Sequence, residues 1–140
     1  VAQTVVLDTS RGMLLQATKK PGLQAVRASA AALPFPDGSF HTVLCVDAFH
    51  HFLNQEDVLK EVARVLAPSG RLFIHDFDAS RLMVRLIGAM ERLWGNRGAF
   101  RRPEELQRLC QGQGLKPLWE ARESMEYFLL LEKPAQATPS

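Results

Sequence analysis

Short apolar runs alternate with segments of helical spacing along the first half of the chain. Three runs have the length and composition of strands: residues 4–7, 23–27 and 42–46. The third run is apolar throughout, which predicts a strand buried on both faces of a parallel sheet. Ser10 is a candidate N-cap for a short helix after the first run. Prolines and a glycine in residues 34–38 predict a loop ahead of the third strand.

The second half continues this alternation. Helices are predicted after Asn54, across residues 82–94 and from Pro103 to Gly114. We expect Pro68 and Gly70 to end the first of them. Further strands are predicted over residues 72–77, 116–120 and 125–132. The last two are close enough to pair as an antiparallel hairpin.

Strands that alternate with helices predict an α/β fold with a mostly parallel sheet, crossover helices and a C-terminal antiparallel hairpin. The sequence has no internal repeat and no linker-like segment. We therefore expect a single domain over residues 1–134, followed by a flexible tail over residues 135–140.

Composition limits the classes of partner. The chain is 46% hydrophobic and 23% charged, which is typical of a globular domain. Its net charge is +2, and its basic pairs are short and separate, so we expect no nucleic-acid partner. No apolar run has the roughly 20 residues of a spanning helix, and no signal peptide is visible. We expect a cytoplasmic protein without a membrane partner, whose Cys45 and Cys110 are buried free thiols.

Asp8 is the first candidate for chemistry. It stands at the carboxyl end of the first predicted strand, where open α/β sheets place ligand-binding groups. A carboxylate at this point can accept two hydrogen bonds from a ribose diol. Asp8 is equally well explained as a helix cap or a turn former.

A second group of polar residues follows the strand over residues 42–46. Asp47, His50 and His51 should lie on the same rim as Asp8, and one histidine could act as a general base. The alternative is a histidine pair that caps a helix and covers the sheet edge. Adjacent histidines without a Cys or Glu partner do not have zinc-site spacing, so we expect no metal. Asp76, at the end of the next strand, is equally ambiguous.

Three segments together resemble the class I S-adenosylmethionine-dependent methyltransferases, particularly the ubiquinone/menaquinone-biosynthesis type. They are residues 5–14, 32–40 and 61–71. The resemblance implies a Rossmann-like sheet and S-adenosylmethionine as cofactor, with S-adenosylhomocysteine as product. It also implies a set of cofactor-binding residues: Asp8 on the ribose, Thr9 and Met13 on the adenine side, and Ser29, Ala30 and Asp47.

The chain departs from that family at two places that matter. Ser29 stands where the family usually has an acidic residue for the adenine amino group, so adenine recognition should be weaker. The family's first strand and glycine-rich loop should precede Asp8 by roughly twenty residues, but only seven precede it. That strand lies between the strand that ends at Asp8 and the strand over residues 42–46. We therefore expect an N-terminally truncated domain whose sheet is completed by a missing N-terminal segment, a second copy of the chain or a rearranged strand.

The resemblance implies transfer of a methyl group from S-adenosylmethionine to a small-molecule acceptor. His50 and His51 are the candidate catalytic residues. The apolar segment over residues 82–94, with Arg85 and Arg92, should cover the acceptor or else pack into the core. One alternative is a non-catalytic interaction module that has lost cofactor binding. A nicotinamide-dependent oxidoreductase also needs a glycine-rich loop and explains residues 33–40 less well.

Overall fold

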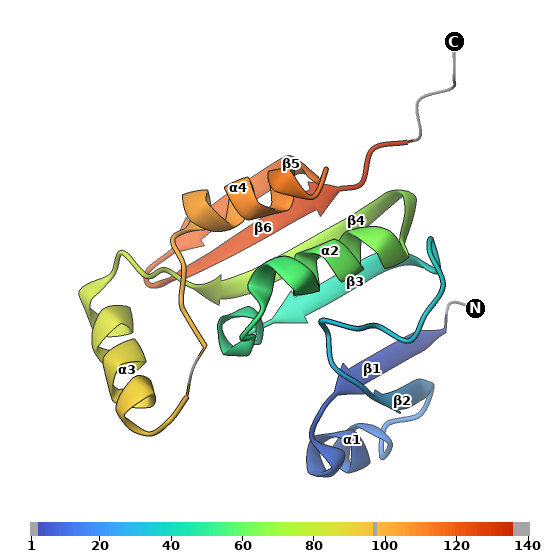
Figure 1. Cartoon of the computed structure of the whole chain (residues 1–140), viewed down its shortest axis with the longest axis horizontal. Coiled ribbons are helices and arrows are strands. Elements are labelled where there is room, and N and C mark those ends of the chain that lie inside the picture. Colours follow the sequence, from blue (N-terminus) through green and yellow to red (C-terminus); the bar gives the residue numbers. More distant parts are fainter. Residues whose placement is uncertain (1–2, 97, 136–140) are drawn as a thin grey trace.

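A computed structural model describes residues 3–96 and 98–135 of the chain (Figure 1). The predicted tail lies outside these residues from position 136 onward. The strands are β1 (Thr4–Asp8), β2 (Leu23–Arg27), β3 (Phe40–Val46), β4 (Leu66–Phe77), β5 (Lys116–Glu123) and β6 (Glu126–Glu132). The helices are α1 (Arg11–Ala17), α2 (Gln55–Val65), α3 (Leu82–Leu93), α4 (Pro103–Gly112) and the 3₁₀ turn η1 (Phe49–His51).

The strands form two separate sheets. β1 and β2 pair in parallel, and the larger sheet has the order β3-β4-β6-β5. Within it β3 and β4 are parallel, whereas β6 is antiparallel to both β4 and β5. The predicted α/β class and its C-terminal hairpin are confirmed. Among the described residues, no strand joins β1 to β3.

The hydrophobic core lies between one face of the larger sheet and the helices α2 and α4. Helical spacing directs Val58, Leu59, Val62 and Val65 of α2 inward, and strict alternation does the same for Tyr127, Leu129 and Leu131 of β6. Pro103 begins α4, where its missing N–H leaves no backbone hydrogen bond unmade. Cys45 and Cys110 are free, and burial raises the pKa of both thiols to about 12.

The prediction that the strand over residues 42–46 is buried on both faces is wrong. Val43 and Cys45 pack against the core, but Leu44 and Val46 point the other way and are 67% and 56% exposed. Side chains alternate along a strand, and α2 covers only one face of β3. The other face has no covering element among the described residues.

Two local predictions also change. Asn54 occupies the N-cap of α2, but its side chain makes no capping hydrogen bond. α2 does end before Pro68, yet the next strand starts at Leu66 rather than at residue 72. Backbone hydrogen bonds from Lys133 N to Gly70 O and from Ser69 N to Lys133 O hold this early part of β4 against the end of β6.

The helices of the described ranges, 3–96 and 98–135, include none that is long and apolar enough to cross a bilayer.

Candidate functional site

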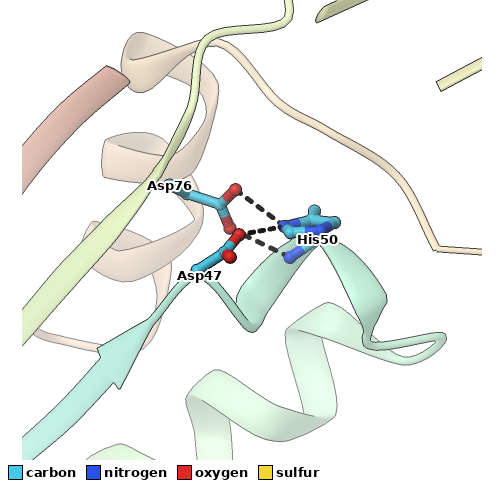
Figure 2. A group of neighbouring side chains, drawn as sticks. All are labelled: Asp47, His50 and Asp76. Carbon is cyan, nitrogen blue, oxygen red and sulfur yellow. Dashed lines mark hydrogen bonds and ion pairs between the residues drawn. The ribbon is translucent and has the colours of Figure 1, made fainter. Parts of the chain in front are cut away.

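A cluster of three polar side chains lies at the carboxyl ends of β3 and β4. His50 on η1 is 5% exposed and Asp76 at the end of β4 is 2% exposed. His50 Nδ1 lies 2.8 Å from Asp76 Oδ1, and the His50 backbone N–H donates to Asp76 Oδ2 at 3.0 Å. Asp47 Oδ1 lies 3.9 Å from the same ring nitrogen. Figure 2 shows both carboxylates turned toward the imidazole.

The local backbone places these groups. Asp47 directly follows β3 and has a left-handed φ of 49°, which turns the chain from the strand into η1. Its N–H donates to His75 O at 2.9 Å, so the turn is fixed to the neighbouring strand β4. The result brings His50 above the end of β4, where Asp76 emerges.

The protonation of His50 reflects two opposing effects. Burial alone would lower the pKa of the imidazole, because a charged ring is poorly solvated there. The hydrogen bond that the ring donates to Asp76 and the charges of Asp76, Asp47 and Glu91 together outweigh burial and raise the pKa above 6.5. His50 therefore keeps its proton to a higher pH than a free imidazole does.

The segment after α3 crosses over His50. Phe100 stacks on the His50 ring with centroids 4.3 Å apart and planes 15° apart. Gly98 passes so close that a Cβ built there would lie 1.9 Å from His50 O. The buried Gln55 side chain donates to Ala99 O at 2.9 Å and to Phe49 O at 3.3 Å, which ties this crossing to η1.

His51 has a different environment from His50. Its side chain is exposed, its ring centroid lies 4.0 Å from that of His50, and its Nδ1 lies 3.4 Å from Asn96 Nδ2. Of the two adjacent histidines, His50 is thus buried and His51 is accessible to solvent.

Asp8 lies in the smaller sheet, at the carboxyl end of β1. Its Oδ1 accepts from Ser10 N at 2.9 Å, while the Ser10 side chain caps α1 by accepting from Met13 N. The predicted Ser10 cap is confirmed. Thr9 O accepts from Arg27 Nε at 3.0 Å, which joins the ends of β1 and β2. An open depression runs between this sheet and α1, and its lining residues are Val6, Asp8, Met13, Gln16, Ala17, Lys20 and Leu23.

Ser29 and Ala30 lie in the loop that follows β2. The Ser29 hydroxyl is exposed and accepts from Ala31 N at 3.2 Å, and Ala30 packs against the core. The later part of the loop is held by an ion pair on α2. Glu61 accepts from Leu33 N at 2.8 Å, and Arg64 donates to Leu33 O at 3.0 Å and to Phe35 O at 2.8 Å.

Six of the sequence-predicted residues therefore fall into two groups. Asp47, His50 and His51 come together, whereas Asp8 and Thr9 lie at the end of β1 and Met13 lies on the adjoining α1. Figure 1 shows β1 and β3 running in the same direction, so both groups lie at the carboxyl ends of strands on one side of the molecule. No hydrogen bond or ion pair within residues 3–96 and 98–135 connects them.

Sequence reasoning left Asp76 undecided and missed Gln55, Gly98 and Phe100. The position of Asp76 at a strand end was the available signal for its role. Nothing in the local sequence indicates that Phe100 would meet His50, because fifty positions separate them along the chain. The contact depends on the path of the chain after α3.

The Asp47, His50 and Asp76 ligand atoms all lie within 4.8 Å of one another, so their spacing could accommodate a cation. Asp76, however, already accepts hydrogen bonds from the His50 ring, the His50 N–H and the Phe77 N–H. A cation would have to displace the His50 ring from Asp76 Oδ1. This geometry is that of a buried ion pair.

Comparison with known proteins identifies the family to which this chain is related. A family described as a methyltransferase domain matches residues 1–74. A demethylmenaquinone methyltransferase of Thermus thermophilus is 35% identical over 92% of this chain and 67% of its own length. The YcgJ protein of Bacillus subtilis has a similar structure, with a TM-score of 0.77 at 17% identity over 96% of this chain and 84% of that one.

The fold alone does not identify a reaction. The crystal structure of a [4+2]-cyclase, SpnF, matches with a TM-score of 0.80 at 14% identity, over 96% of this chain and 67% of that one. The sequence matches carry the assignment, because they cover more than half of the chain and include the segments around Asp8 and Leu33. The chain belongs to the class I S-adenosylmethionine-dependent methyltransferase family.

Proposed function

We propose that this chain binds the ribose and adenine side of S-adenosylmethionine and takes part in transferring its methyl group to a small-molecule acceptor. The observation that carries the proposal is Asp8, which stands at the carboxyl end of β1 in a chain of this family. The cofactor supplies an electrophilic methyl group. The protein's residues bind, align the acceptor and exclude water.

The surroundings of Asp8 fit a ribose. Oδ1 is engaged by Ser10 N, and Oδ2 accepts no hydrogen bond from the described residues. A carboxylate held by one backbone donor keeps its orientation and can accept from a ribose hydroxyl through the other oxygen. Met13 lines the same depression and offers an apolar contact for the adenine side. Ser29 can contribute only its exposed hydroxyl.

We also propose that a parallel strand from outside the described residues pairs with both β1 and β3. One feature supports this proposal: among the described residues, β1 pairs only with β2, and β3 pairs only with β4. Unpaired parallel edges leave backbone donors and acceptors without partners. A segment N-terminal to this sequence is the first candidate, and a second copy of the chain is the other.

His51 is the better placed of the two candidate bases. His50 is buried, its Nδ1 faces Asp76, and its raised pKa keeps it protonated over more of the neutral range. His51 is exposed and rests on His50, so it can reach an acceptor. We propose that His51 accepts a proton where the acceptor must lose one, and that His50 and Asp76 position η1.

Calorimetric titration with S-adenosylhomocysteine tests cofactor binding, using this chain and a longer protein with the preceding coding sequence. Asp8→Asn should weaken binding by about tenfold, because a charge-assisted hydrogen bond contributes about 1.5 kcal/mol or more. Asp57→Asn removes an exposed carboxylate from α2 and serves as the matched control. Absence of binding to either protein would favour the non-catalytic module.

Transfer of a labelled methyl group to a panel of phenols and quinols tests the reaction. His51→Gln should lower kcat by about a hundredfold for acceptors that must lose a proton, with little change in KM. A kcat that is unchanged by this substitution would remove His51 from the mechanism without affecting the assignment of Asp8.

A further inference from the structure

Helix α3 turns two arginines toward the protein and its apolar residues toward solvent. At about 100° per residue, Arg85 and Arg92 project within roughly 100° of Val84, the buried residue of the helix. Leu86 and Leu93 project roughly 160° or more away from Val84 and are 53% and 85% exposed. An ordinary surface helix has the reverse arrangement, with its charged face in water and its apolar face on the core. The position of the two arginines therefore needs a reason of its own.

A small cavity lies between α3 and the segment that follows it. The chain turns back alongside the helix on its way to α4 (Figure 1), so that a Cβ built on Gly88 would lie 3.3 Å from the Phe100 ring. The cavity has a volume of about 130 Å³, and Arg85 and Arg92 line it from the side of α3. The rest of its lining is small or apolar and includes Gly98 and Phe100. A space of this size admits a carboxylate or phosphate group with a few attached atoms.

No carboxylate of the described chain offsets the charge of the two arginines. Within residues 3–96 and 98–135, Arg85 and Arg92 take part in none of the ion pairs, and the cavity lining includes no acidic residue. Glu91 of the same helix is half-buried, and its charge contributes to the raised pKa of His50. Both arginines are exposed, so a ligand can reach them from solvent. Guanidinium groups beside an apolar wall are suited to oxyanions, whose oxygens accept their hydrogen bonds.

The cavity adjoins the histidine pair of the candidate site. Phe100 lines the cavity and also stacks on the His50 ring, with centroids 4.3 Å apart. Gly98 lines it as well, and a Cβ built there would lie 2.8 Å from His51 Cα. One short segment of chain thus forms a wall of the cavity and covers the two histidines.

We propose that this cavity binds an oxyanion, either a carboxylate or a phosphate, and that the group belongs to the methyl acceptor. The second part rests on the proposed function, in which His51 faces the acceptor. Arg85 and Arg92 then select acidic acceptors, and the Phe100 ring contacts the apolar body of the molecule. The two arginines bind and take no part in the chemical step. A free inorganic anion has the same chemistry, so the experiment includes both sources.

Calorimetric titration of the whole chain, without cofactor, tests the oxyanion site. The probes are 3,4-dihydroxybenzoate, its uncharged analogue 3,4-dihydroxybenzamide, and inorganic phosphate. The benzoate should bind about tenfold more tightly than the benzamide, because only the carboxylate makes charge-assisted hydrogen bonds with the guanidinium groups. Arg85→Gln and Arg92→Gln should each lower the benzoate affinity by about fivefold and leave the benzamide affinity unchanged.

Arg108→Gln is the matched control. Arg108 is an exposed arginine of α4 that, in the described part of the chain, takes part in none of the ion pairs. This variant should bind all three probes as the parent does. Circular dichroism of each variant establishes that the comparison is made between folded proteins.

Inorganic phosphate separates the two sources of the anion. If phosphate binding depends on Arg85 and Arg92 while the benzoate and the benzamide bind equally well, the cavity is a site for a free anion and its assignment to the acceptor is overturned. If neither arginine substitution changes the affinity for any probe more than Arg108→Gln does, the oxyanion site itself is overturned.

The anion site can be tested separately from cofactor binding. Asp8→Asn should leave the benzoate affinity unchanged. Arginine-dependent binding of the benzoate, without binding of S-adenosylhomocysteine to this chain or to the longer protein, would retain the oxyanion site and overturn its assignment to a methyl acceptor. In the longer protein, Arg92→Gln should raise the KM for the benzoate by about fivefold with little change in kcat, as expected for a residue that only binds.

Discussion

The His50 imidazole and the Asp76 carboxylate lie 2.8 Å apart, although 26 residues separate them along the chain. Both side chains are almost fully buried, and Asp76 also accepts from the His50 backbone N–H. One carboxylate thus fixes both the ring and the backbone of η1 against the end of β4. This contact sets the position of the exposed His51 beside it.

Stability should depend on pH through this pair. The folded pKa of His50 is raised above 6.5, so its protonated form contributes stability that is fully present below about pH 6.5. That contribution is lost as the pH rises through the folded pKa. The free energy of unfolding, measured by denaturant titration across this range, should fall with rising pH. His50→Gln should remove this part of the slope, and a slope that persists unchanged would contradict the assignment.

Removing one partner of the pair should be costly. Asp76→Asn should lower the free energy of unfolding by about 3 kcal/mol, because it leaves a buried imidazole without its counter-charge. The pKa of His50, followed by NMR, should drop because burial then acts with less opposition. A double-mutant cycle with His50→Gln should show a coupling energy above about 1 kcal/mol. Additive effects would mean that the two side chains stabilise the fold independently.

Gly98 should tolerate no side chain. A Cβ there would lie 1.9 Å from His50 O and 2.8 Å from His51 Cα, and both are backbone atoms that cannot rotate away. Gly98→Ala should lower the melting temperature by an amount equivalent to about 2 kcal/mol or more. Gly112→Ala, in α4 with open space around it, is the matched control and should be neutral or stabilising by about 0.5 kcal/mol. Equal melting temperatures for the two variants would rule out the close approach.

Arg64 should control the order of the loop over residues 33–37. It donates to Leu33 O, Phe35 O and the Asp37 carboxylate, and the hydrogen bond that it donates to Glu61 lowers the pKa of that carboxyl group. Arg64→Met should speed hydrogen exchange at the Leu33 amide by about fivefold, because loss of the ion pair loosens the Glu61 acceptor. Lys60→Met on the exposed side of α2 should leave this exchange rate unchanged. If the Leu33 amide exchanges as slowly in the Arg64→Met protein as in the parent, Glu61 holds Leu33 without help from Arg64.

Much of the fold was predictable because its signals are local. The β2 range and the starts of α3 and α4 agree with the apolar periodicity and with Pro103. Ser10 caps α1 as expected, since an N-cap needs only a side chain three residues from its donor. The burial of β3 was not predictable from its own residues. An apolar strand is buried on both faces only where other elements cover both.

Some features of the candidate site were likewise predictable from the sequence, and others depended on the tertiary structure. The order of Asp8, Asp47 and Asp76 along the chain, each at the end of a strand, indicated where polar groups would gather, and the segments over residues 5–14, 32–40 and 61–71 indicated the family. Tertiary structure alone selected His50 as the buried partner of Asp76 and left His51 accessible. It also brought Phe100 and Gly98 over the pair and turned the apolar side of α3 outward. Strand ends and caps follow from neighbours a few residues apart, whereas these contacts depend on where distant segments of one chain come to lie.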